Sequence, residues 1–149
     1  GINYVGAVVR VYREALDRLA EEGEAYRFRP EWLEELYKIS HRGYTTGFLF
    51  GAPQDVGQEY ESRYIRSHEF VGLVESVGSD GSAVVAVRNQ IKAGESVEWL
   101  GRGMSLGVVP NVELLDETSV PLQLANPNSR IRLRPPFPVE QFDLLRKSR

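Results

Sequence analysis

The sequence contains no cysteine among its 149 residues. Disulfides, thiolate metal sites, iron–sulfur ligation and cysteine nucleophiles are therefore excluded from these residues. Histidine is nearly as scarce, because only His41 and His68 occur, and neither stands at a spacing typical of a metal site or beside a recognisable catalytic partner. We interpret both histidines as structural or surface residues. We expect no catalytic residue, no bound metal and no cofactor in this chain.

The sequence also lacks an excess of basic charge and any long hydrophobic run. The formal net charge is −3, which argues against a strongly basic surface that binds nucleic acid over the whole domain. No apolar run approaches the roughly 18 residues that a membrane span requires. The first residues do not form the basic and hydrophobic pattern of a secretory signal. We therefore expect a cytoplasmic chain without a membrane partner.

The first segment, from Asn3 to Glu22, has apolar residues at helical spacing with charged residues between them. This pattern predicts an amphipathic helix that ends at Gly23. Its apolar positions are Val5, Val8, Val9, Tyr12, Leu16 and Leu19. Burial of six such side chains would contribute on the order of 10 kcal/mol before entropy is counted. We expect this face to pack on the second helix or the β-domain, or to mediate self-association, whereas in a larger protein it would contact a catalytic domain.

A second helix is predicted from Pro30 to near Ser40, because proline is favoured in the first turn of a helix. The residues expected to face inward are Leu33, Leu36 and Tyr37. The acidic pairs Glu21-Glu22 and Glu34-Glu35 are interpreted as solvated side chains on the polar faces.

From about Thr45 the pattern changes to short β-prone runs separated by turn residues. Strands are expected at 45–50, 70–77, 83–88, 96–100, 108–115, 121–124 and 130–134. Asp80-Gly81 lies between two of these runs and predicts a hairpin turn. The order predicts an α+β chain, with a helical segment at 1–42 followed by a small, mostly antiparallel β-barrel at 43–149 that is closed or nearly closed.

The last predicted strand carries three arginines at alternating positions: Arg130, Arg132 and Arg134. Side chains alternate across a strand, so these arginines face one side while Ile131 and Leu133 face the core. Beyond residue 100 there are seven Lys or Arg against five Asp or Glu, whereas residues 1–100 contain eleven against sixteen. The functional interpretation is a substrate-binding strip that contacts phosphates, supplemented by Arg146 and Lys147. The alternative is a solvated face paired with acidic neighbours.

One motif resembles a known family. The segment from His41 to Phe48 is similar to the signature at the start of the C-terminal domain of collagenase-like peptidases, family U32. The matching positions are His41, Arg42, Tyr44, Thr45, Gly47 and Phe48. Further similar segments are 12–17, 70–74, 88–95, 125–127 and 142–146. The run from Phe70 to Leu100 also resembles the small barrel of elongation factor Tu domain two.

The resemblance implies a role as well as a fold. The catalytic part of the family is similar to an N-terminal α/β barrel with several cysteines, so the expected partner of this chain is a missing N-terminal catalytic domain of the same protein. Family members are named as peptidases, while some relatives hydroxylate tRNA or ribosomal RNA bases using prephenate and an iron–sulfur cluster. We therefore expect a non-catalytic accessory domain that helps present an RNA substrate. The alternatives are an exosite for collagen-like protein substrates and a purely structural or oligomerisation module.

Overall fold

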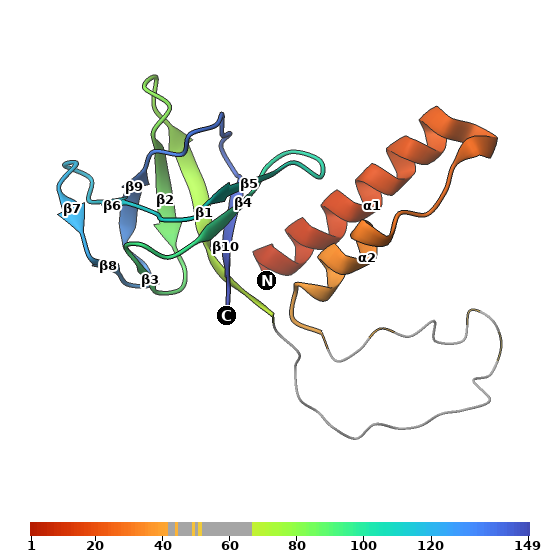
Figure 1. Ribbon diagram of the computed structural model, residues 1–149, viewed down its shortest axis with the longest axis horizontal. Helices are drawn as coiled ribbons and strands as arrows, with labels where there is room; N and C mark the ends of the chain where they lie inside the picture. Colours follow the sequence, from red (N-terminus) through yellow and green to blue (C-terminus); the bar gives the residue numbers. More distant parts are fainter. Residues whose placement is uncertain (42–43, 45–48, 50, 52–66) are drawn as a thin grey trace.

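The computed structural model describes residues 1–41, 44, 49, 51 and 67–149. A pair of helices lies beside a curled antiparallel sheet (Figure 1). The helical part comprises α1 (Ile2–Glu22), a single 3-10 turn η1 (Gly23–Ala25) and α2 (Pro30–Tyr37). The expected α+β class is confirmed. None of the described helices is both long enough and apolar enough to cross a membrane.

The ends of the helices follow local sequence signals. Gly23 terminates α1 with a positive φ of 54°, and its amide donates to the carbonyl oxygen of Leu19. This conformation is accessible to glycine at little cost. Pro30 begins α2 as predicted, although the helix ends at Tyr37, before the predicted end near Ser40.

The predicted inward face of α2 is wrong, and the predicted apolar face of α1 is not buried by the second helix or the sheet, so a second copy and a catalytic domain remain as its expected partners. The buried residues of α1 are Ala7 and Val11, whereas five of its six predicted apolar positions are exposed and Val8 is half-buried. The five are Val5, Val9, Tyr12, Leu16 and Leu19. In α2 the buried residues are Trp32 and Glu35, while Leu33 and Tyr37 are exposed and Leu36 is half-buried.

The reason is that Trp32 dominates the packing of α2. Its ring stacks on Tyr26, with centroids 6.0 Å apart, and meets the edge of Phe28, with centroids 5.8 Å apart. A buried tryptophan removes more apolar surface from water than Leu33 would. Once Trp32 faces inward, the residue one helical turn later, Glu35, faces inward as well. Hydrophobic spacing alone did not identify this face.

The sheet consists of short strands. In chain order they are β1 (His68–Val77), β2 (Ala83–Val87), β3 (Ile91–Lys92), β4 (Val97–Leu100), β5 (Leu106–Val109), β6 (Leu114–Leu115), β7 (Pro121–Leu122), β8 (Leu124–Ala125), β9 (Arg130–Leu133) and β10 (Leu144–Ser148). Eight of them form one sheet in the order β5-β4-β10-β1-β2-β9-β6-β7, and β3 pairs with β8. All the pairings are antiparallel.

The sheet curls into a half-barrel rather than a closed barrel. Among the described residues, β5 and β7 form its two edges and are not paired with each other. The expectation of a closed or nearly closed barrel is thus corrected to an open one. Its predicted start near Thr45 lies outside the described residues. The apolar core lies within the curl, and Val71, Val85, Trp99, Ile131 and Leu145 are almost completely buried there.

The predicted hairpin between β1 and β2 is confirmed. The amide of Gly78 donates to the carbonyl oxygen of Ser82 at 2.7 Å, and Gly81 adopts a positive φ of 78°. A carboxylate oxygen of Asp80 accepts hydrogen bonds from the amide and the hydroxyl of Ser82. These side-chain bonds close the turn in the way expected of an aspartate before glycine.

Strand β10 was not predicted, yet it occupies the middle of the sheet. It pairs with β1 on one side and with β4 on the other. The alternation of burial along it is broken, because Leu144, Leu145 and Arg146 are all buried. A period of two is therefore absent from this segment, which explains why pattern analysis missed it. The strand also carries Arg146, which forms the polar centre described next.

Candidate functional site: a buried ion-pair network

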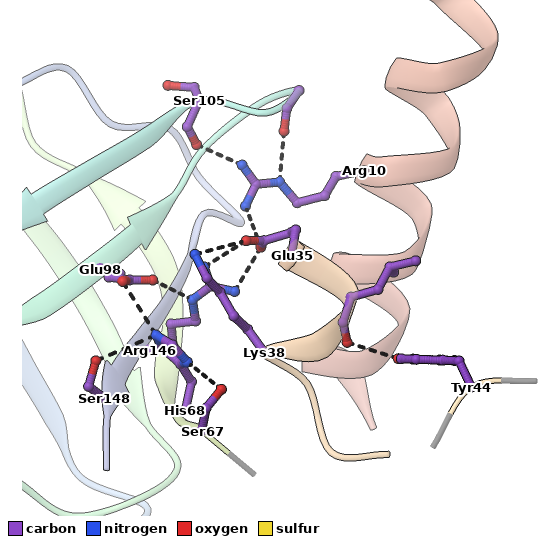
Figure 2. A network of polar contacts seen from close by, with 12 residues as sticks. Arg10, Glu35, Lys38, Tyr44, Ser67, His68, Glu98, Ser105, Arg146 and Ser148 are labelled. Atoms are coloured by element: carbon purple, nitrogen blue, oxygen red, sulfur yellow. Dashed lines mark hydrogen bonds and ion pairs between the residues drawn. The ribbon is translucent and has the colours of Figure 1, made fainter. Parts of the chain in front are cut away.

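A network of charged side chains joins the helices to the sheet (Figure 2). Arg146 on β10 donates two hydrogen bonds to the carboxylate of Glu35 on α2, from Nη1 at 2.7 Å and from Nη2 at 2.8 Å. Its Nε donates to Glu98 on β4, also at 2.7 Å. The guanidinium therefore serves two carboxylates at once. This bidentate geometry is among the strongest charge-assisted arrangements that side chains form.

Further cations surround Glu35. Arg10 on α1 donates from Nη1 to the carboxylate of Glu35 at 3.3 Å, and Lys38 Nζ lies 3.6 Å from its other oxygen. Arg10 also donates to the carbonyl oxygens of Gly103 and Ser105, in the loop between β4 and β5. Both helices are thereby tied to the sheet through one centre (Figure 2).

His68 at the start of β1 completes the network on the sheet side. Its Nε2 lies 3.4 Å from Glu98, and its Nδ1 lies 2.9 Å from the hydroxyl of Ser67. Burial lowers the pKa of His68, and the nearby charge of Arg146 acts in the same direction, against the raising effect of Glu98. The neutral imidazole is therefore favoured at neutral pH.

The two carboxylates remain ionised although they are partly removed from water. Burial by itself would raise the pKa of Glu35, but the hydrogen bonds and charge of Arg146, together with Arg10 and Lys38, outweigh it and lower that pKa. The pKa of Glu98 is lowered for the same reasons, mainly by Arg146. Burial also opposes the charge on Arg146, yet Glu35 and Glu98 raise its pKa. The centre is a charge-compensated clamp.

The network corrects two sequence interpretations. Glu35 was interpreted as solvated, but it is 5% exposed, and only its neighbour Glu34 is on the exposed face. Arg146 was assigned to a substrate-binding surface, but it is 1% exposed and fully engaged by carboxylates. The sequence held one sign that Glu35 is buried: it stands three residues after Trp32 and therefore lies on the same face of the helix.

Lys147, the other predicted supplement, is also engaged. Its Nζ donates to both carboxylate oxygens of Glu95, at 3.1 Å and 2.9 Å, and to the carbonyl oxygen of Gln90 at 2.9 Å. It links β10 to the loop between β3 and β4. Its charge is therefore largely compensated within the fold.

Arg130 and Arg132 of β9 alternate with buried apolar residues, as predicted, but the strand ends at Leu133, one residue before Arg134. Arg130 and Arg134 are exposed, Arg132 is half-buried, and Ile131 and Leu133 between them are in the core. Arg130 is paired with Glu75, whose carboxylate accepts a hydrogen bond from its Nε at 2.6 Å. Arg132 contacts the hydroxyl of Ser82 at 3.4 Å. Both the basic strip and the acidic neighbours of the alternative interpretation are thus present.

Two positions of the predicted family motif are described, His41 and Tyr44. His41 is buried and stacks on the ring of Tyr44 with centroids 4.8 Å apart, while Tyr37 meets both rings edge-on. The Tyr44 hydroxyl donates to the carbonyl oxygen of Leu36. These contacts pack the motif against the end of α2. The remaining motif positions, Arg42, Thr45, Gly47 and Phe48, lie outside the described residues.

Comparison with known families identifies the chain. Residues 66–146, which contain the whole curled sheet except the end of β10, match the family described as peptidase family U32 C-terminal domain. Residues 1–59, which contain the two helices, match peptidase family U32. The chain belongs to peptidase family U32. The resemblance inferred from the motif at His41 is confirmed.

Two curated proteins are similar in sequence. The chain is 37% identical over 99 residues to tRNA hydroxylation protein P of Escherichia coli strain K12, and 35% identical over 100 residues to tRNA hydroxylation protein P of Haemophilus influenzae strain Rd. Each alignment covers 65% of this chain and 21% of the relative. The chain therefore spans about a fifth of the length of these relatives.

Two solved structures, both of the C-terminal domain of a protein of Geobacillus thermoleovorans described as a U32 peptidase, are also similar. One, a selenomethionine variant, has 27% identity and a TM-score of 0.49, and covers 53% of this chain and 99% of that one. The other has 24% identity and a TM-score of 0.48, and covers 54% of this chain and 92% of that one.

Proposed function

We propose that this chain is a non-catalytic accessory part of a U32 protein, and that it helps present structured RNA, such as a tRNA, for base hydroxylation. The observation that carries the proposal is the 37% identity with a protein named for tRNA hydroxylation. The chemistry of the hydroxylation is assigned to another domain of the protein, because these residues contain no cysteine to hold an iron–sulfur cluster.

The arginine strip of β9 is the surface through which the RNA would be bound. Arg130 at the start of β9 is exposed, and so is Arg134, which directly follows the end of the strand at Leu133. Arginine is suited to this role, because its planar guanidinium donates to phosphate oxygens in a bidentate manner. The strip is short and partly compensated by Glu75. It would therefore orient an RNA that is held mainly by another domain.

The buried network supports this role by holding the strip in position. An RNA contact on β9 is useful only when the sheet has a definite orientation relative to the domain that modifies the base. Arg146 and Glu35 fix the helices to the sheet with paired hydrogen bonds. The segment matched by peptidase family U32 and the segment matched by its C-terminal domain are thus joined by these hydrogen bonds.

The test is RNA binding by the full-length protein in which Arg130→Gln and Arg134→Gln are combined. Affinity for bulk tRNA would be measured by filter binding between 50 and 200 mM salt. Each lost phosphate contact reduces the slope of log K against log salt by about 0.7 for single strands and about 0.9 for duplex. We expect a slope smaller by about 1.4 to 1.8 on the same basis, together with reduced base hydroxylation in cells.

A control is Arg27→Gln, which removes one positive charge from the segment between η1 and α2, whereas β9 lies in the sheet (Figure 1). Arg27 donates to the backbone carbonyl oxygens of Glu24 and Tyr26 and is exposed. Its variant should bind tRNA like the unaltered protein. Equal salt slopes and equal hydroxylation for the β9 variant would remove the strip from the proposal.

The family name favours a second candidate, in which the protein is a peptidase and this chain is an exosite for a collagen-like substrate. Deletion of residues 66–149 from the full-length protein would then abolish gelatin cleavage, with the remaining domain still folded. A full-length protein that cleaves no gelatin but restores tRNA hydroxylation would reject this candidate.

A further inference from the structure

The outward face of α1 is an apolar ridge. Its side chains are Ile2, Val5, Val9, Tyr12, Leu16 and Leu19, all of them about half exposed or more. Leu16 is 60% exposed and Tyr12 is 62% exposed. Contiguous apolar surface of this kind is uncommon on soluble monomers and usually marks an interface.

An apolar groove lies along each side of this ridge. The larger one, with a volume of about 580 Å³, runs between α1 and the sheet, and Leu73, Leu100 and Leu144 line it. The smaller one, of about 220 Å³, runs between α1 and α2 and is lined by Trp32 and Leu33. A ridge between two grooves is the shape that packs against the side chains of helices in another domain.

An exposed aromatic ring lines each groove. Phe142 borders the larger groove and is 68% exposed, and Phe28 borders the smaller one. Phe142 has a positive φ of 76°, a conformation that a bulky residue rarely adopts. Its amide donates to the carbonyl oxygen of Val74, and the amide of Val74 donates to the carbonyl oxygen of Asp143. The backbone is therefore held so that the phenyl ring stands at the rim of the groove.

The charges beside the ridge indicate the chemistry of its partner. Arg13 is paired with Asp17 at 2.9 Å, and Arg18 is paired with Glu14 at 2.9 Å. Arg13 and Arg18 are thus compensated within α1, and Arg10 is compensated by Glu35 of α2. A surface that is apolar and neutral in this way is suited to protein rather than to the phosphates of RNA.

We propose that the α1 ridge and its two grooves dock against another domain of the same U32 protein. Two observations identify this occupant. The helices match peptidase family U32 over residues 1–59, separately from the C-terminal domain match over 66–146. The relatives are also far longer than this chain, which spans 21% of their length. The inference rests on the proposed role as part of a larger protein but not on the RNA substrate.

Docking of α1 would determine where the sheet lies. Arg10 joins α1 to Glu35 and to the loop between β4 and β5, and Glu35 joins α2 to Arg146 in the middle of the sheet. A domain that binds the ridge therefore also positions the sheet and the arginines of β9. The apolar ridge supplies the attachment and the buried ion pairs supply the orientation.

The test is hydroxyl-radical footprinting of the full-length protein without RNA. Four leucines of the chain form a matched set: Leu16 and Leu19 lie on the ridge, whereas Leu106 and Leu124 lie on β5 and β8. The ridge pair is 60% and 49% exposed, and the sheet pair is 44% and 39% exposed. We expect Leu16 and Leu19 to be oxidised at least fivefold more slowly than Leu106 and Leu124. Oxidation of the ridge leucines at an equal or faster rate would overturn the proposal.

A series of protein concentrations distinguishes docking by another domain from docking by a second copy of the protein. Protection by another domain is independent of protein concentration, whereas protection by a second copy disappears on dilution, and that result would also overturn the proposal. In the full-length protein, Leu16→Glu should restore rapid oxidation of Leu19, and Leu106→Glu should not. Because no RNA is present, this experiment can fail while the tRNA-binding test succeeds, and the reverse also holds.

Discussion

Arg146, near the end of the chain, donates two hydrogen bonds to the carboxylate of Glu35 on α2, which lies 111 residues earlier in the sequence. Both side chains are almost completely buried. Ion pairs in the interior add little to stability when compared with well-packed apolar residues, but removal of one partner leaves a buried charge uncompensated. The contact therefore specifies how the helices sit on the sheet.

The first prediction concerns this pair. Glu35→Ala removes the partner that receives two hydrogen bonds from Arg146, and it should lower the free energy of unfolding by about 3 to 5 kcal/mol. Urea denaturation followed by tryptophan fluorescence would measure the change. Glu34→Ala is the matched control, because Glu34 is exposed on the same helix and its loss should change stability by less than about 0.5 kcal/mol. Similar effects of the two substitutions would contradict the clamp.

The second prediction concerns pH. The folded-state pKa of His68 lies below its ordinary value of 6.5, so the unfolded chain binds more protons and stability should fall as the pH drops below that value. The folded-state pKa values of Glu35 and Glu98 lie below their ordinary value of 4.5, so their contribution is present above that value and is lost as the pH falls further.

Burial raises the pKa of Asp143, so this residue makes the protein more stable, not less, as the pH falls. The measurement is the urea midpoint between pH 7.5 and pH 3.5, with His68→Asn as the comparison. In the variant, the urea midpoint should no longer decline from about pH 6.5, but it should still decline steeply at more acidic pH. A profile of His68→Asn that follows the unaltered chain throughout would refute the assignment to His68.

The third prediction concerns the hairpin between β1 and β2. Gly81 has a φ of 78°, a conformation that costs an L-residue with a side chain roughly 1 to 2 kcal/mol. Gly81→Ala should therefore lower the free energy of unfolding by about that amount. Gly101→Ala is the control, because an added Cβ there would meet nothing closer than 3.7 Å. Thermal unfolding followed by circular dichroism would compare the two, and equal melting temperatures would argue against the turn.

The fourth prediction concerns catalysis. The purified chain should cleave neither casein nor gelatin and should bind no iron, because it has no cysteine. His68 does lie beside Ser67 and Glu98, but Glu98 is engaged by Arg146 in the ion-pair network. Zymography and metal analysis of the same preparation would test both statements. Reproducible cleavage that persists through repeated purification would overturn the accessory role.

Several features of the fold follow from local sequence signals. Gly23 and Pro30 bound the helices where predicted, and Asp80-Gly81 forms the predicted hairpin. Such signals work because a positive φ or a missing amide proton constrains the backbone wherever the residue occurs. The alternation of Arg130, Ile131 and Arg132 could also be predicted, because successive side chains of a strand point to opposite faces of the sheet.

The candidate site was less accessible to the same reasoning. Strand β10 was missed because burial does not alternate along it, and Arg146 was therefore interpreted as a surface residue. Glu35 was grouped with Glu34, although a single step of 100° along the helix separates a buried carboxylate from an exposed one. A charged side chain is expected on the surface unless an oppositely charged partner for it is known. The partner of Glu35 is Arg146, which lies on β10, 111 residues further along the chain.

The sequence by itself determined the two helices, several of the strands, the turn between β1 and β2, the family and the apolar composition of α1, because these depend on contacts between near neighbours in the chain or on motifs. The tertiary structure decided which face of α1 is covered, where the sheet opens, and which charges are buried. Those outcomes depend on pairs such as Arg146 and Glu35, which meet only when distant segments pack together. Hydrophobic spacing states that a helix has an apolar face, but the partner that covers that face is selected by the surfaces available in three dimensions.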